Sequence, residues 1–183
     1  MESSQDCNRL SFIRAGTIRM ILLHEVEAMA VEMTDSIVRL NQADDGVAAE
    51  IKVLHDAAYA VEAQLLGLEA FPPLKRTLES YAESNSIFFG YMHKGRCVGS
   101  VELEAASLDV LEVSSLVVDP EFSRRGVATK LMTHVLSEAG TRRLTVSTAC
   151  ANYPAINLYK GLGFRAVDEW VSDDGIDIVK LAK

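Results

Sequence analysis

The chain has 183 residues, of which 49% are hydrophobic and 24% charged, and its formal net charge is −8 at pH 7. This length is enough for one domain with a substantial hydrophobic core. The negative charge argues against nucleic acid or an anionic membrane as the main partner.

The cysteines and the apolar runs restrict the class of protein further. The three cysteines have no paired spacing, so the sequence predicts neither a disulfide framework nor a metal site. Unpaired cysteines are typical of the reducing cytoplasm, where we expect this protein. The longest apolar run near the N-terminus, residues 20–23, is far too short to span a bilayer, so no membrane partner is expected.

The first predicted elements are a strand and two helices. Residues 36–40 fit a short strand, and the turn at 44–46 introduces a helix over residues 47–66. Phe71-Pro72-Pro73 breaks that helix, and a second helix is expected over residues 74–84. The core-facing stripe of the first helix is predicted to be Ile51, Leu54, Ala58, Val61 and Leu65.

A β-hairpin is predicted next. Residues 86–92 and 96–104 form its two strands, with the turn at His93-Lys94-Gly95. In the second strand, apolar and polar residues alternate with a period of two over residues 100–105, but Val98 and Gly99 break the alternation upstream. We therefore expect Glu102 and Glu104 on a solvated face.

A strand, a basic loop and a helix follow. Residues 109–118 fit a strand that ends at Asp119-Pro120, because proline has no N–H to continue a ladder. The loop Ser123-Arg124-Arg125-Gly126 precedes a helix that starts at Val127 and ends at Gly140. The unpaired N–H groups of a helix N-terminus attract anions, and arginines suit phosphate oxygens. The loop therefore indicates a pyrophosphate site, with an exposed basic turn as the alternative.

The last part of the chain alternates strand, helix and two strands. Residues 144–149 fit a strand, and Asn152 and Pro154 suit the cap and the first turn of a short helix. Residues 166–171 and 176–181 fit two strands joined by an Asp-Gly turn.

Two motifs in this half of the chain resemble the signature of the GNAT superfamily of acyl-CoA-dependent N-acetyltransferases. The first family motif is Gln/Arg-x-x-Gly-x-Gly/Ala after a strand, and residues 123–128 read SRRGVA. The second is an Asn-x-x-Ala-x-x-Leu-Tyr-x-x-x-Gly-Phe helix some thirty residues later, and residues 152–164 match every defined position. Ser123 stands where the family motif has Gln or Arg. This departure affects one side-chain contact to the pyrophosphate but not the contacts from the backbone N–H groups.

The resemblance implies an α/β fold of the GNAT type. Its sheet would be mixed, mostly antiparallel and twisted, with six to seven strands flanked by about four helices. The acetyltransferase domain would occupy residues 34–183. Residues 1–33 would be an N-terminal extension, partly disordered or helical over residues 17–33. A homodimer is one assembly that the sequence allows.

The resemblance also implies how acetyl-CoA is bound. Backbone groups of Val117 and Val118 would serve the pantetheine arm from the strand, and Asn152 would serve it from the other side. The full set of expected contacts is Leu116, Val117, Val118, Arg124, Arg125, Gly126, Val127, Ala128, Thr129, Asn152, Ala155, Leu158 and Tyr159.

Two residues are expected to carry the catalysis. Tyr159 matches the family tyrosine whose hydroxyl points at the coenzyme sulfur, so it is the predicted general acid; packing against the last strands is the alternative. Glu112 is the predicted general base, because it lies 11 residues before Ser123 (123 − 112), the offset of the base in the histone-acetylating branch of the family. Burial in a strand would raise the pKa of Glu112 toward that of a working base. The alternative is a solvated strand glutamate.

These inferences predict an enzyme that moves an acetyl group from acetyl-CoA to a primary amine by direct attack in a ternary complex. The acceptor is interpreted as a small molecule. A protein lysine or N-terminus, and a non-catalytic acyl-CoA-binding regulatory module, are the alternatives. In the resembled family the helices expected over 47–66 and 74–84 wall the acceptor pocket. His55, on the first of them, is interpreted as an ordinary surface or flank histidine.

Overall fold

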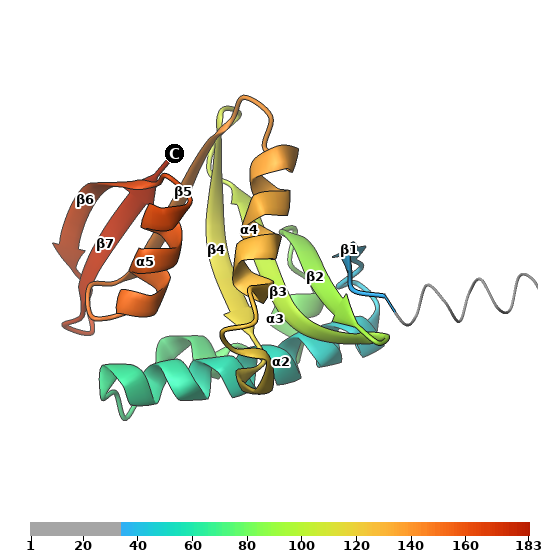
Figure 1. Ribbon diagram of the computed structural model, residues 1–183. Coiled ribbons are helices and arrows are strands. Elements are labelled where there is room, and N and C mark those ends of the chain that lie inside the picture. Colours follow the sequence, from blue (N-terminus) through green and yellow to red (C-terminus); the bar gives the residue numbers. More distant parts are fainter. Residues whose placement is uncertain (1–33) are drawn as a thin grey trace, which may run out of the picture.

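A seven-stranded twisted sheet runs through the molecule, with helices on both of its faces (Figure 1). The computed structural model describes residues 34–183, so the predicted N-terminal extension and its helix lie outside the described residues. The strands are β1 (Ser36–Leu40), β2 (Ile87–His93), β3 (Arg96–Ala105), β4 (Val110–Val118), β5 (Arg143–Ala149), β6 (Arg165–Val171) and β7 (Asp177–Ala182).

The strand order across the sheet is β1-β2-β3-β4-β5-β7-β6. Every neighbouring pair is antiparallel except β4 and β5, which are parallel. The predicted mixed, mostly antiparallel sheet is therefore confirmed.

Within the described residues, four α-helices and two short 3₁₀ helices connect the strands. They are α2 (Asp45–Leu66), η1 (Pro72–Lys75), α3 (Leu78–Ala82), η2 (Pro120–Phe122), α4 (Val127–Glu138) and α5 (Tyr153–Gly161). Within residues 34–183, none of the helices combines the length and the apolar character that crossing a membrane requires.

Helices α2 and α4 cover opposite faces of the central strands. Leu54 of α2 packs with Val117 of β4, whereas Leu131 of α4 packs into the main core with Val101 of β3. Strand β3 is consequently buried on both faces from Cys97 to Leu103. This double cover explains why its sequence does not alternate cleanly, since polar residues on one face must find partners inside the protein.

The parallel strands β4 and β5 part halfway along their length. They pair only where Val110–Val113 faces Arg143–Val146, although β4 continues to Val118 and β5 to Ala149. Beyond the last pair the two strands diverge toward α2 (Figure 1). A register shift between Glu102 and Leu103 of β3 accompanies the divergence. The sheet is thereby open at its centre, because no backbone partner fills the gap.

Helix α2 forms as predicted, but its inner face is different. Asp44 caps it by accepting hydrogen bonds from the N–H groups of Gly46 (2.9 Å) and Val47 (3.1 Å). Val61 and Leu65, predicted to face the core, are 50% and 53% exposed. Ile51 and Leu54 are buried as predicted, and Ala58 packs beside Leu54. Ala48 and His55 are also buried in this first half of the helix, whereas in the second half Tyr59, Glu62 and Leu66 turn inward instead.

The second predicted helix is wrong in its first half. Pro72 and Pro73 start the 3₁₀ helix η1, and Arg76 returns to an extended conformation. Thr77 then caps the short helix α3 by accepting a hydrogen bond from the Ser80 N–H (3.3 Å). Thr77 is thus the N-cap of a separate helix. The apolar spacing continues across Thr77, and it therefore suggested one longer helix.

Candidate active site

The loop before α4 has the backbone conformation of an anion-binding turn. Gly126 has a φ of 79°, and Arg124 has a φ of 61°, which is uncommon for a residue other than glycine. Such turns direct successive N–H groups to one side, and α4 adds the partial positive charge of its N-terminus. A Cβ atom built on Gly126 would meet no atom within 4 Å, so the space above this turn is open.

That open space is a cavity of about 490 Å³, the α4 cavity. Its lining comes from the end of β4, the basic loop, the first turn of α4 and the outer side of α5. The residues are Val118, Phe122, Ser123, Arg124, Gly126, Val127, Ala128, Thr129, Pro154, Asn157 and Leu158.

Neighbouring side chains fix the loop. The Arg125 guanidinium lies 4.9 Å from the centre of the Phe122 ring. Arg96 forms an ion pair with Asp119, which also accepts a hydrogen bond from the Glu121 N–H (2.9 Å). The loop is therefore held from β3, and Arg124 rather than Arg125 faces the cavity.

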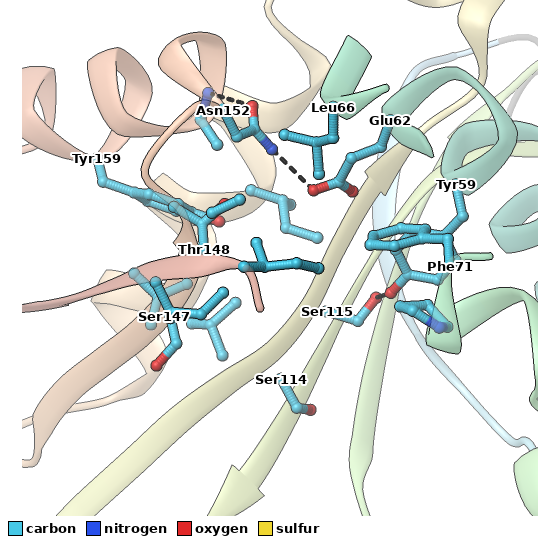
Figure 2. A pocket seen from close by; sticks show the side chains of 18 residues that line it. Tyr59, Glu62, Leu66, Phe71, Ser114, Ser115, Ser147, Thr148, Asn152 and Tyr159 are labelled. Carbon is cyan, nitrogen blue, oxygen red and sulfur yellow. Dashed lines mark hydrogen bonds between the residues drawn. The ribbon is translucent and has the colours of Figure 1, made fainter. Parts of the chain in front are cut away.

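A second cavity, of about 210 Å³, occupies the gap between β4 and β5 (Figure 2). We refer to it as the strand cavity. Helix α2 and the segment that follows it close one side, and the start of α5 closes the other. The lining residues are Tyr59, Glu62, Leu66, Phe71, Pro73, Val113, Ser114, Ser115, Leu116, Val146, Ser147, Thr148, Ala149, Asn152, Ala155, Tyr159, Ile176 and Ile178.

Tyr159 reaches the strand cavity from α5. Its side chain is only 4% exposed, and its ring packs 5.7 Å from that of Phe164. Within residues 34–183, its hydroxyl has no hydrogen-bond partner, although it lines the cavity. Burial raises the pKa of this phenol well above its usual range, so it carries its proton at neutral pH. Its hydroxyl is thus a proton donor available to a ligand.

Asn152 joins the two sides of the strand cavity. Its side-chain oxygen accepts a hydrogen bond from the Ala155 N–H (3.2 Å), which caps α5. Its side-chain nitrogen donates to Oε1 of Glu62 on α2, at 2.8 Å. Figure 2 shows the two side chains meeting above the cavity. Burial raises the pKa of Glu62, and the bond from Asn152 partly offsets that increase.

The structure brings most of the predicted coenzyme contacts to the two cavities. Leu116, Asn152, Ala155 and Tyr159 line the strand cavity. Val118, Arg124, Gly126, Val127, Ala128, Thr129 and Leu158 line the α4 cavity. The side chain of Val117 turns away and packs against Leu54 and Cys97, and Arg125 stacks on Phe122 outside the lining.

Glu112 lies away from this arrangement. Its carboxylate is 3.5 Å from the Lys180 ammonium of β7, and its side chain is 31% exposed. It lines neither cavity. The structure therefore does not bring Glu112 next to Tyr159, and its role as base stays a prediction.

Sequence reasoning missed the α2 side of the cavity. Tyr59, Glu62 and Leu66 are spaced by three and four residues, which places them on one helix face. That spacing was a usable signal. It was overlooked because the neighbouring stripe through Val61 and Leu65 is more hydrophobic.

A buried polar network between α2 and the sheet supports the α2 side of the strand cavity. His55 is fully buried: its Nε2 is 2.9 Å from the Ser100 hydroxyl and its Nδ1 is 3.1 Å from the Tyr81 hydroxyl. The expectation of a surface histidine is therefore wrong. Tyr59 donates a hydrogen bond to Ser115 of β4 (3.1 Å).

The prediction that Glu102 lies on a solvated face is also wrong. It is 1% exposed, because Arg76 covers it with two hydrogen bonds of 2.6 and 2.9 Å. The Arg76 guanidinium also lies 3.9 Å from the centre of the Tyr81 ring. This ion pair fastens the segment between η1 and α3 to the sheet.

Comparison with known proteins agrees with this geometry. The Acetyltransferase (GNAT) family model matches residues 54–164, which is more than half of the chain. The chain therefore belongs to the GNAT family of acetyltransferases, and it is by class an acyl-CoA-dependent N-acetyltransferase.

Individual relatives are distant. The UPF0157 protein YqkA of Bacillus subtilis is 28% identical over 131 residues, which cover 71% of this chain but 38% of YqkA. The [Ribosomal protein bS18]-alanine N-acetyltransferase of Escherichia coli K12 is 28% identical over 111 residues, 59% of this chain and 72% of that protein. The PaiA N-acetyltransferase of Thermoplasma acidophilum, solved with coenzyme A, has a TM-score of 0.65 at 14% identity, covering 81% of this chain and 98% of that one.

Proposed function

We propose that this protein transfers an acetyl group from acetyl-CoA to a primary amine by direct attack in a ternary complex. The observation that carries the proposal is that the two cavities lie next to each other along β4 and α5. Leu116 and Tyr159 face the strand cavity, and Val118 and Leu158, one or two residues away on the same elements, face the α4 cavity. This path suits a long donor substrate with an anionic group at one end and a reactive group at the other.

The α4 end suits the diphosphate of coenzyme A. The Gly126 turn presents backbone N–H groups, the N-terminus of α4 attracts negative charge, and Arg124 adds a cation. The solved PaiA structure contains coenzyme A on the same fold, which supports coenzyme A as the ligand. The pantetheine arm would then follow the open end of β4 past Val118 and Leu116 into the strand cavity.

Tyr159 is proposed as the general acid. Attack by an amine on a thioester releases a thiolate, whose pKa is about 8.5 by analogy with cysteine. A buried phenol beside the sulfur would return a proton to it. Because a thiolate of this pKa leaves readily, the expected contribution is modest, at or below the ~10²–10⁴ typical of general acids.

The amine must lose a proton before it can attack. An amine with a pKa near ~10.4 is free base in only about one molecule in 2,500 at pH 7. Glu112, the base expected from the sequence, would have to act through water, because it lines neither cavity.

The test of the proposal is thiol release from acetyl-CoA over a panel of amines, with the Tyr159→Phe variant. We expect turnover to fall by about 10- to 100-fold while acetyl-CoA affinity, measured by calorimetry, stays the same. Tyr153→Phe is the matched control, since Tyr153 is 69% exposed on the same helix. Equal turnover in Tyr159→Phe and the control would remove Tyr159 as the acid.

The N-terminus of a protein is a second candidate acceptor. The Escherichia coli relative is a ribosomal-protein alanine N-acetyltransferase by name and is 28% identical over 111 residues. Peptides with N-terminal alanine therefore belong in the amine panel, and their rate relative to small amines decides between the two acceptor types.

A further inference from the structure

The charge distribution of the strand cavity restricts the acceptor. Among the lining residues in the described part of the chain, Glu62 is the one with a charged side chain. No lysine, arginine or histidine of that lining faces it. The remainder is apolar, aromatic or hydroxylic apart from the Asn152 amide, and Ser147, Thr148 and Ser115 provide hydroxyl groups.

One oxygen of the Glu62 carboxylate is left open to a ligand. Oε1 accepts the hydrogen bond from Asn152, whereas Oε2 accepts no hydrogen bond from residues 34–183 and is not enclosed by them. A partly buried carboxylate without a cation is costly, and the attraction of an incoming cation would repay that cost. Tyr59 and Phe71, whose ring centres are 5.7 Å apart, add aromatic surface next to Glu62, which also favours a cation.

We propose that the acceptor enters the strand cavity as an ammonium ion held by Glu62, and that it carries no carboxylate beside its amine. This inference rests on the proposed function and specifies its substrate class. A free α-amino acid would place its carboxylate close to Glu62 in a cavity without a compensating cation. An alkyl or arylalkyl amine, and a peptide N-terminus whose carboxyl group is an amide, avoid that repulsion.

The same contact lets Glu62 act as the base. The ammonium gives one proton to the Glu62 carboxylate, and the freed lone pair of the nitrogen attacks the thioester carbon. The carbon–sulfur bond then breaks, the thiolate takes the proton of Tyr159, and the nitrogen loses its second proton as the amide forms. Tyr159 recovers a proton from that nitrogen, and Glu62 releases its own to water, so one proton leaves per turnover.

Two other titratable groups face Glu62. Tyr59 lies on the same helix and Tyr159 on α5, and burial raises the pKa of both phenols. Both phenols therefore remain protonated near neutral pH. Glu62 is the carboxyl group among the lining residues, and burial raises its pKa above the ordinary value. No charged residue of β4, β5 or β7 within the described chain lines the cavity.

The experiment compares matched acceptors that differ by one carboxylate. Phenethylamine is paired with phenylalanine, and alaninamide, a minimal model of a peptide N-terminus, is paired with free alanine. In the wild-type protein we expect each acid to react with a kcat/KM at least about 100-fold below that of its partner, because like charges in a water-poor site repel strongly. Equal rates within a pair, or preference for the acid, would overturn the proposal without any variant. The two pairs also distinguish a small amine from a peptide as the source of the ammonium.

Glu62→Gln keeps the acceptor for the Asn152 bond and removes the charge. We expect its kcat/KM for phenethylamine at pH 7 to fall by about 100-fold or more, with an unchanged KM for acetyl-CoA. Activity should recover toward pH 10, where the free base is abundant, and the discrimination against phenylalanine should shrink. Glu50→Gln, an exposed residue of the same helix, is the control. Wild-type turnover with an unaffected Glu62→Gln variant would refute only this inference, whereas no turnover by the wild type with any amine would refute the proposed function.

Discussion

Tyr159 and Glu62 reach one cavity from opposite sides, and burial changes what each can do. The pKa of both groups is raised, so the phenol keeps its proton and the carboxylate becomes a stronger base. Asn152 lies between their elements and donates to Glu62 while it caps α5. At the scale of single residues, the site therefore contains a buried proton donor, Tyr159, and a partly buried proton acceptor, Glu62, which reach it from different helices.

Gly126 provides a sharp test of the anion site. Gly126→Glu should weaken acetyl-CoA binding by about 100-fold or more, because a carboxylate would occupy the turn that presents N–H groups to a diphosphate. Gly126→Asn is the control, since asparagine tolerates a positive φ better than other residues and adds no charge. Calorimetry with acetyl-CoA measures both. Equal affinities in the two variants would contradict the assignment of the diphosphate to this turn.

At the scale of elements, the ion pair of Arg76 with Glu102 holds the cavity wall to the sheet. The Glu102 side chain is 2% exposed and that of Arg76 25% exposed. Removing one partner of such a pair leaves an uncompensated charge inside the protein.

Arg76→Met should accordingly lower the free energy of unfolding by about 3 kcal/mol. Combining it with Glu102→Met should recover part of the loss, because a buried pair of apolar side chains leaves no charge unpaired. Chemical denaturation of both single variants and of the double variant, with the exposed Arg142→Met as control, measures both effects. A double variant as unstable as the sum of its single variants would show that the two residues act independently.

The elements that local sequence determines were predicted well. The basic loop, the start of α4 and the Asn152 cap all depend on residues within a few positions, so the motifs identified residues that the fold brings to the lining of the two cavities. The acceptor side was not predictable in the same way. Glu62 reaches the strand cavity because α2 lies beside the gap between β4 and β5, and Glu112 is paired because β7 returns beside β5.

Buried polar residues show the same dependence on the tertiary fold. His55 bonds to residues 45 and 26 positions away, and Arg76 to one 26 positions away. Nothing local distinguishes such residues from solvated ones. Their burial follows from α2 covering the face of β3 that carries Ser100 and Glu102.

At the scale of the whole molecule, His55 should make stability depend on pH. Burial lowers its pKa from 6.5 to about 3, with Arg76 contributing by repulsion. Between these values the unfolded chain binds a proton that the folded protein does not, so stability is complete above pH 6.5 and is lost as the pH falls toward 3. At pH 5 the loss from this group is about 2 kcal/mol, at about 1.36 kcal/mol per pH unit.

Urea denaturation at pH 8 and pH 5 measures this dependence in the wild type and in His55→Gln. The variant should be less stable at pH 8, because glutamine does not reproduce both hydrogen bonds of the imidazole. Its stability should nevertheless fall by about 2 kcal/mol less than that of the wild type between the two pH values, since it has no proton to take up at this position. Glu62 opposes the trend in both proteins, because a carboxyl with a raised pKa favours the folded state at low pH. The difference between wild type and variant therefore isolates His55, and an identical pH dependence in the two proteins would mean that the folded state accommodates a protonated imidazole.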